Sequence, residues 1–122
     1  NKDELKFRTN QFAHRCVKLA ISLPKTILGR HIAGQLIRCS TSVAAKYRAV
    51  CTSQSRASFV AKLAIAIEET DETAFWIEFL AEEKLIKNER LNALLQEAKE
   101  LLAIFIASQQ TARRSSKKAS SV

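Results

Sequence analysis

Four carboxylates precede the only tryptophan of the chain: Glu68, Glu69, Asp71 and Glu72, with Trp76 one helical turn beyond. Paired carboxylates can exchange protons with a substrate or hold a metal ion. A bundle metal site of the ferritin type needs Glu-x-x-His on facing helices, and neither histidine follows an acid at that spacing. The acids are therefore better explained as partners for a cation elsewhere in the chain.

Other side chains that commonly do chemistry are sparse. His14 and His31 have no acid or cysteine at ligand spacing, and the chain has no glycine-rich phosphate loop and no Gly-x-Ser-x-Gly. Cys16, Cys39 and Cys51 form no Cys-x-x-Cys pair, which is typical of small core residues in a reducing compartment, with a reactive thiol as the alternative. We therefore expect a non-enzymatic, cytoplasmic protein with no catalytic residue, metal or cofactor.

The charge of the chain is divided unevenly along its length. The formal net charge is +8, from 20 Lys and Arg against 12 Asp and Glu. Residues 1–56 hold 11 basic and 2 acidic residues, whereas residues 57–122 hold 9 basic and 10 acidic residues. No acid occurs between Leu5 and Ile67. Such a one-signed half indicates a polyanionic partner, an internal match to the acidic half, or both.

Basic side chains on one face of the first helix, near the ends of the second and in the tail could neutralise phosphates. The candidate nucleic-acid-binding residues are Arg8, Arg15, Lys18, Lys25, Arg30, Arg48, Arg56, Arg113, Arg114, Lys117 and Lys118. The alternatives are a plain solvated surface and an anionic membrane surface. The membrane is disfavoured because the apolar stripe of the first helix is needed for the core. No aromatic residue interleaves the basic ones, so we expect phosphate-led binding with weak sequence specificity and no base stacking.

The elements that must position these residues are helices. The chain has 47% hydrophobic residues, only 2 Gly and 1 Pro, and few runs typical of strands. Apolar residues recur at helical spacing, Pro24 ends the first helix, and Thr26, Ser55 and Asn88 can cap the next three. No apolar run is long enough to cross a membrane. The four helices are predicted at residues 5–23, 26–50, 56–84 and 88–112.

Short connections between these helices predict an all-α, antiparallel up-down-up-down four-helix bundle over residues 1–112. Residues 113–122 hold 4 basic residues, no acid and 4 serines, and are predicted to be a disordered tail.

The third helix is apolar on so many sides that we expect protein against more than one of them. Glu69, Glu72 and Trp76 then share an inward face and require a cation, which Arg38 of the second helix can supply. Buried, such a pair would fix helix register more than it stabilises. In the alternative, this side of the second helix faces solvent, and Arg38 and Lys46 join the basic surface. In the fourth helix, residues 101–106 have no polar face for nearly two turns, which indicates a contact between subunits.

Three segments together resemble a known family: QLIRCSTSVAAKY at 35–47, SRASFVAKL at 55–63 and ETDETAFWI at 69–77. They are similar to the four-helix-bundle proteins encoded within intervening sequences of bacterial large-subunit ribosomal RNA genes, long labelled a ribosomal protein. The resemblance covers roughly residues 7–107, in order and with matching gaps. The accessory variability determinant of diversity-generating retroelements is a relative of that family.

The resemblance implies a bacterial, cytosolic, non-enzymatic homopentameric ring associated with RNA. Its retroelement relative is similar to a basic barrel that binds nucleic acid and a reverse transcriptase, so a protein-binding adaptor is the alternative function. The family's polar network falls on Arg38, Glu69, Glu72 and Trp76, as architecture rather than catalysis. One departure is Lys46, where the family usually has Asn, because a buried ammonium there would need an acid partner or a shifted pKa.

Overall fold

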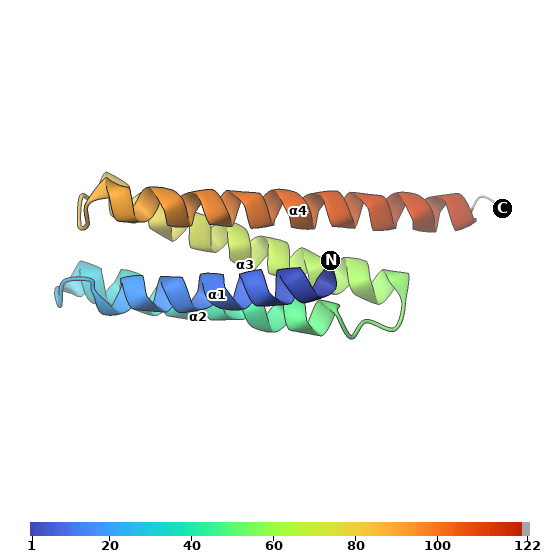
Figure 1. Cartoon of the computed structure of the whole chain (residues 1–122), viewed down its shortest axis with the longest axis horizontal. Coiled ribbons are helices and arrows are strands. Elements are labelled where there is room, and N and C mark those ends of the chain that lie inside the picture. The colour runs from blue at the N-terminus through green and yellow to red at the C-terminus, as the bar shows by residue number, and fades with distance from the viewer. Residues whose placement is uncertain (121–122) are drawn as a thin grey trace.

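The computed structural model describes residues 1–120, with side chains described for residues 1–115. Over this part of the chain the protein is all-α, without a strand. Its four helices are α1 (Lys2–Ile21), α2 (Ile27–Val50), α3 (Arg56–Glu82) and α4 (Asn88–Ser120). Consecutive helices run antiparallel as an up-down-up-down bundle, in which each packs on the next and α1 meets α4 less extensively (Figure 1).

Local chemistry fixes where the helices begin. The Asn1 side chain accepts from the backbone N–H of Glu4 in a capping box that starts α1 three residues before the predicted Leu5. Thr26 and Ser55 cap α2 and α3 as predicted, each accepting a backbone N–H at 3.0 Å. Gly29 is required in the tight turn after Pro24, because a Cβ there would lie 2.0 Å from the Pro24 carbonyl oxygen.

All four helices contribute to one apolar core. Fully buried side chains include Phe12 of α1, Leu36 of α2, Ile77 of α3 and Phe105 of α4. The Tyr47 and Phe105 rings stack at 5.3 Å between centroids and join α2 to α4 across the bundle. Such packing gives the outer faces of the helices a fixed relative position.

The end of α4 differs from the prediction. The helix was expected to stop at about Ala112, but it continues to Ser120 and projects beyond the ends of the other helices (Figure 1). No Gly or Pro follows Ala112, and basic residues near a helix C-terminus are favourable to its dipole, so nothing local ends the helix there. The predicted disordered tail is thus helical as far as Ser120, while residues 121–122 lie outside the described residues.

The third helix is covered by its neighbours on only part of its surface. Its apolar residues are spread around its circumference, yet Phe75 is 51% exposed and Ile65 is 44% exposed. Protein covers more than one side of α3, as predicted, since the helix packs against α2 and α4, but its outer side is open in the single chain. In α4, Leu101 and Phe105 are buried while Ile106 remains exposed. Only part of the 101–106 segment is therefore left uncovered by the bundle and open to contact with another subunit.

Candidate nucleic-acid interface

A polar network joins α2 to α3. The Arg38 guanidinium donates to Glu69 at 3.4 Å and to Glu72, and it also donates to the Gln35 side-chain oxygen at 3.0 and 3.2 Å. The indole N–H of Trp76 donates to Glu72 at 3.2 Å. The structure thus brings together the four residues that the sequence assigned to one network.

This network lies at the rim of the α2/α3 interface rather than in the interior. The Arg38 side chain is 49% exposed and that of Glu72 is 36% exposed. The expectation of an inward-facing pair is therefore wrong for the single chain, because no third helix covers these groups. Ion pairs this open to water contribute little to stability, so the network serves mainly to align the two helices.

Aromatic side chains continue this rim along α3. Trp76 meets Phe75 and Phe79 with centroids 4.9 and 6.0 Å apart, and His31 of α2 packs edge-on against the indole at 5.5 Å. Lys46, the departure from the family pattern, is exposed at the other end of α2. Its ammonium therefore needs no internal acid.

Arg8 was predicted to bind nucleic acid, but it is engaged within the bundle. Its guanidinium donates to both carboxylate oxygens of Glu97 on α4, at 2.6 and 3.1 Å, with Glu100 at 3.8 Å. The hydrogen bond to Glu97, whose side chain is only 18% exposed, raises the pKa of Arg8. Arg8 thus ties α1 to α4 and is not an open cation, a correction that follows from a pairing across 89 residues of sequence.

The other predicted cations with described side chains are exposed and form no ion pair with a described residue: Arg15, Lys18, Lys25, Arg30, Arg48, Arg56, Arg113 and Arg114. They do not form one continuous patch. Lys25 and Arg30 flank the α1–α2 turn, Arg56 borders a hollow with Lys2 at the start of α3, and Arg113 and Arg114 sit on the projecting part of α4. The side chains of Lys117 and Lys118 lie outside the described residues.

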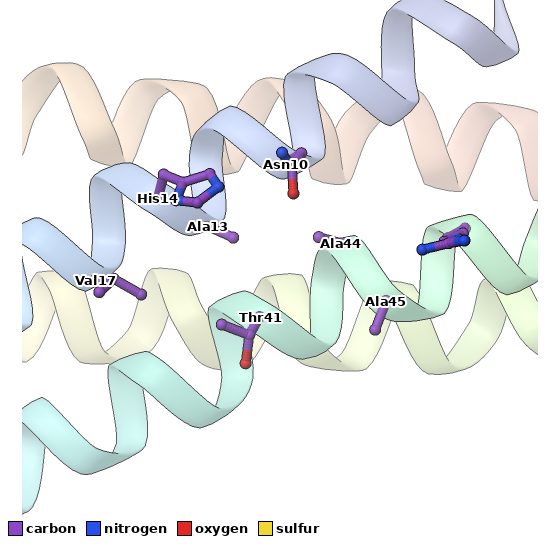
Figure 2. A pocket seen from close by; sticks show the side chains of 8 residues that line it. Asn10, Ala13, His14, Val17, Thr41, Ala44 and Ala45 are labelled. Carbon is purple, nitrogen blue, oxygen red and sulfur yellow. The ribbon is translucent and has the colours of Figure 1, made fainter.

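Arg48 belongs to a groove between α1 and α2. A hollow of about 410 Å³ is lined on the α1 side by Asn10 and His14 and on the α2 side by Thr41 and Ala44 (Figure 2). An adjoining hollow of about 430 Å³ shares Asn10, Ala44 and Arg48 with the first. It is also lined by Lys6 and Phe7 of α1. We refer to the two hollows together as the α1/α2 groove.

The α1/α2 groove is positively charged and contains no acid among its lining residues. Small side chains, Ala13, Ala44 and Ala45, are among its lining residues, and Ala13 of α1 and Ala44 of α2 lie on facing sides of the two helices (Figure 2). Lys6 and Arg48 supply two permanent cations at one end. Volumes of this size are usual for sites that hold small organic groups.

Sequence reasoning missed Lys6, Phe7, Asn10 and His14 as a group. The signal was present, because Lys6, Asn10 and His14 stand at i, i+4 and i+8 within the acid-free stretch. Phe7 follows Lys6 and falls outside the apolar stripe of its helix. Phe7 also stands directly between Lys6 and Arg8, so the statement that no aromatic interleaves the basic residues was wrong.

The cysteines lie mostly inside the bundle. Burial raises the pKa of the Cys16 thiol to about 12, and the nearby Cys39 adds to the rise. The pKa of Cys39 is raised too, also by burial. Neither thiol is therefore available as a thiolate near neutral pH.

No cluster of three or more His, Cys, Asp or Glu side chains gathers at metal-binding distance in residues 1–120. No helix in the same range combines the length and apolarity that crossing a bilayer requires.

Comparison with known families decides what kind of bundle this is. The sequence pattern of the 23S rRNA-intervening sequence proteins matches residues 4–107. The chain belongs to that family. The matched range includes the α1/α2 groove and the Arg38 network, and it ends before the projecting turns of α4.

A solved structure supports the same assignment for this 23S rRNA-intervening sequence protein. The similar chain is a protein of unknown function from the S23 ribosomal protein family of Bacteroides thetaiotaomicron, determined at 1.70 Å resolution. The two chains are 28% identical and superpose with a TM-score of 0.76, over 89% of this chain and 97% of the other. No curated protein matches the chain.

Proposed function

We propose that this intervening-sequence protein is a non-enzymatic, cytoplasmic bundle that binds nucleic acid through phosphate contacts, with RNA favoured over DNA by the family's link to 23S rRNA. The observation that carries the proposal is the acid-free α1/α2 groove, in which Lys6 and Arg48 meet no carboxylate. Arg8 and Arg38 have acidic partners, whereas the remaining cations of the first half have none among the described residues.

We further propose that the chain works as a homo-oligomer, with the family resemblance favouring a pentameric ring. Exposed apolar side chains on α3 and α4, such as Phe75 and Ile106, support a contact between copies. Light scattering before and after nuclease treatment gives the mass of the particle and reveals bound nucleic acid. A stable monomer at micromolar concentration would exclude the ring.

The second candidate function is an adaptor that docks another protein, such as a reverse transcriptase. The aromatic rim formed by exposed Phe75 and the partly buried Trp76 and Phe79 favours it, because aromatic residues are enriched in protein interfaces. Retention of a protein partner after nuclease treatment would support this function over direct nucleic-acid binding.

The test of the first function is the salt dependence of binding to a fluorescently labelled RNA. Lys6, Arg15, Lys18 and Arg48 are four open cations of α1 and α2. If each neutralises one phosphate of a single strand, at a slope of about −0.7 per phosphate, raising salt from about 50 to about 200 mM lowers affinity roughly 50-fold. Arg48→Gln reduces the slope by about 0.7, whereas Lys99→Gln on α4 leaves it unchanged. Binding that is insensitive to salt contradicts the proposal.

A further inference from the structure

The α1/α2 groove combines its cations with the aromatic ring of Phe7, which is not part of the core. Phe7 is 65% exposed, although α1 has a fully buried phenylalanine, Phe12, on its core face. The Phe7 side chain lines the same hollow as Lys6 and Arg48. A large apolar ring that is mostly exposed beside two cations gains little from burial in this chain, and its position suits a ligand with both a flat apolar face and negative charge.

An unpaired nucleotide has both properties. Bases of single-stranded nucleic acid stack on aromatic side chains, while Lys and Arg follow the phosphates. In a duplex the faces of the bases are already stacked on each other, so an isolated surface phenylalanine gains nothing from it. The groove therefore distinguishes single strands from duplexes by the availability of a base.

The rest of the groove suits the same ligand. Asn10 and His14 lie on its α1 side, facing Ala44 and Thr41 across the opening (Figure 2). Neither Asn10 nor His14 forms a side-chain hydrogen bond with a described residue. Their polar atoms remain available for base or sugar edges, next to the small side chains of Ala13 and Ala44.

We propose that the α1/α2 groove is a binding site for an unpaired nucleotide, whose base stacks on Phe7 and whose phosphates meet Lys6 and Arg48. This inference rests on the proposed nucleic-acid binding and makes it more specific. It assigns the protein a preference for single-stranded over double-stranded nucleic acid, and it adds a stacking contribution that does not depend on salt.

The experiment measures fluorescence anisotropy with a labelled single strand and a duplex of the same length. Phe7→Ala should weaken single-strand binding about 5- to 100-fold, the usual effect of losing one stacked base, with the salt slope unchanged. Duplex binding should change less than twofold. Phe7→Trp should restore the affinity for the single strand.

The matched control is Ile21→Ala, which removes an equally exposed apolar side chain from the far end of α1, outside the residues that line the groove. It should leave both affinities unchanged, and circular dichroism confirms that each variant is folded. The groove inference is overturned if Phe7→Ala binds the single strand as tightly as the parent. It is also overturned if Phe7→Ala weakens both ligands equally, or if it lowers the particle mass instead, which would assign the groove to a second copy of the chain. A parent protein that binds neither ligand overturns the proposed function as well.

Discussion

The α2/α3 interface and the α1/α2 interface each present an arginine of α2, and the two arginines have opposite surroundings. Arg38 meets two carboxylates of α3, whereas Arg48 faces a helix that carries no acid after Glu4. At the α2/α3 interface, the arginine is neutralised by acids of the same chain, at a rim open to solvent. The α1/α2 interface leaves its charge without an acidic partner, in a groove lined in part by alanines. The same residue type therefore aligns helices in one place and can hold a ligand in the other.

The largest effect is expected at alkaline pH and comes from the core. Burial raises the pKa of the Cys16 thiol of α1 from 9.0 to about 12, and Cys39 of α2 adds to the rise. The unfolded chain loses this proton near pH 9.0, so above that pH it binds fewer protons than the folded chain. The stabilisation is complete below about pH 9 and is lost progressively up to pH 12, by about 4 kcal/mol in total and about 2 kcal/mol at pH 10.5.

Urea denaturation at about pH 8 and about pH 10.5 checks this prediction. Cys16→Ala should be less stable than the parent at the lower pH, because it leaves a small cavity, but should lose less stability as the pH rises. An equal loss in the two proteins would show that another group controls the alkaline transition. A thiol reagent should also modify the partly exposed Cys51 well before Cys16.

The next effect tests whether an arginine that is paired with an acid inside the bundle is unable to bind RNA. Glu97→Gln breaks the bidentate pair with Arg8, and we expect a loss of about 1–2 kcal/mol, between the values for exposed and buried pairs. The released guanidinium then adds an open cation to α1, so RNA affinity at low salt should rise several-fold. Glu100→Gln, which removes a more distant and more exposed acid, should do less on both measurements. An unchanged RNA affinity would place Arg8 out of reach of the ligand.

The smallest effect is expected at the rim of α2 and α3. A buried Arg38 pair would cost about 3–5 kcal/mol to break, but with Arg38 half exposed we expect Arg38→Ala to cost about 0.5–1 kcal/mol. RNA affinity should stay within about twofold of the parent, because this arginine is already paired. A thermal melt and the same anisotropy assay provide both values. A loss above about 3 kcal/mol would mean that another subunit buries the network.

The sequence predicted the fold well because the relevant signals are local. Helical spacing, Pro24 and the caps at Thr26 and Ser55 act within a few residues, and the structure places the helices accordingly. The end of α4 was predicted wrongly. The polar, basic composition after Ala112 indicated disorder, but none of those residues breaks a helix, and α4 continues to Ser120.

The candidate site was less predictable because it depends on how distant helices align. The pairing of Arg8 with Glu97 needs the register of α1 on α4, which no local pattern contains. The exposure of Phe75 depends on which faces of α3 find a neighbour, and hydrophobicity alone does not decide this. Phe7 could have been noticed as an aromatic residue outside its stripe, but its meeting with Arg48 required the α1/α2 packing.

The fluorescence of Trp76 reports on one side of the molecule, the α2/α3 rim. Trp76 is the only tryptophan, and its indole N–H is bonded to Glu72 at the α2/α3 rim, on a different helix pair from the α1/α2 groove. Its fluorescence therefore senses rupture of the rim directly and the arrival of a nucleotide only indirectly. A change in Trp76 emission on adding RNA would show that binding at the α1/α2 groove alters the α2/α3 rim through the shared helix α2. A constant emission, with RNA binding seen by anisotropy, would show that the two sides of α2 respond independently.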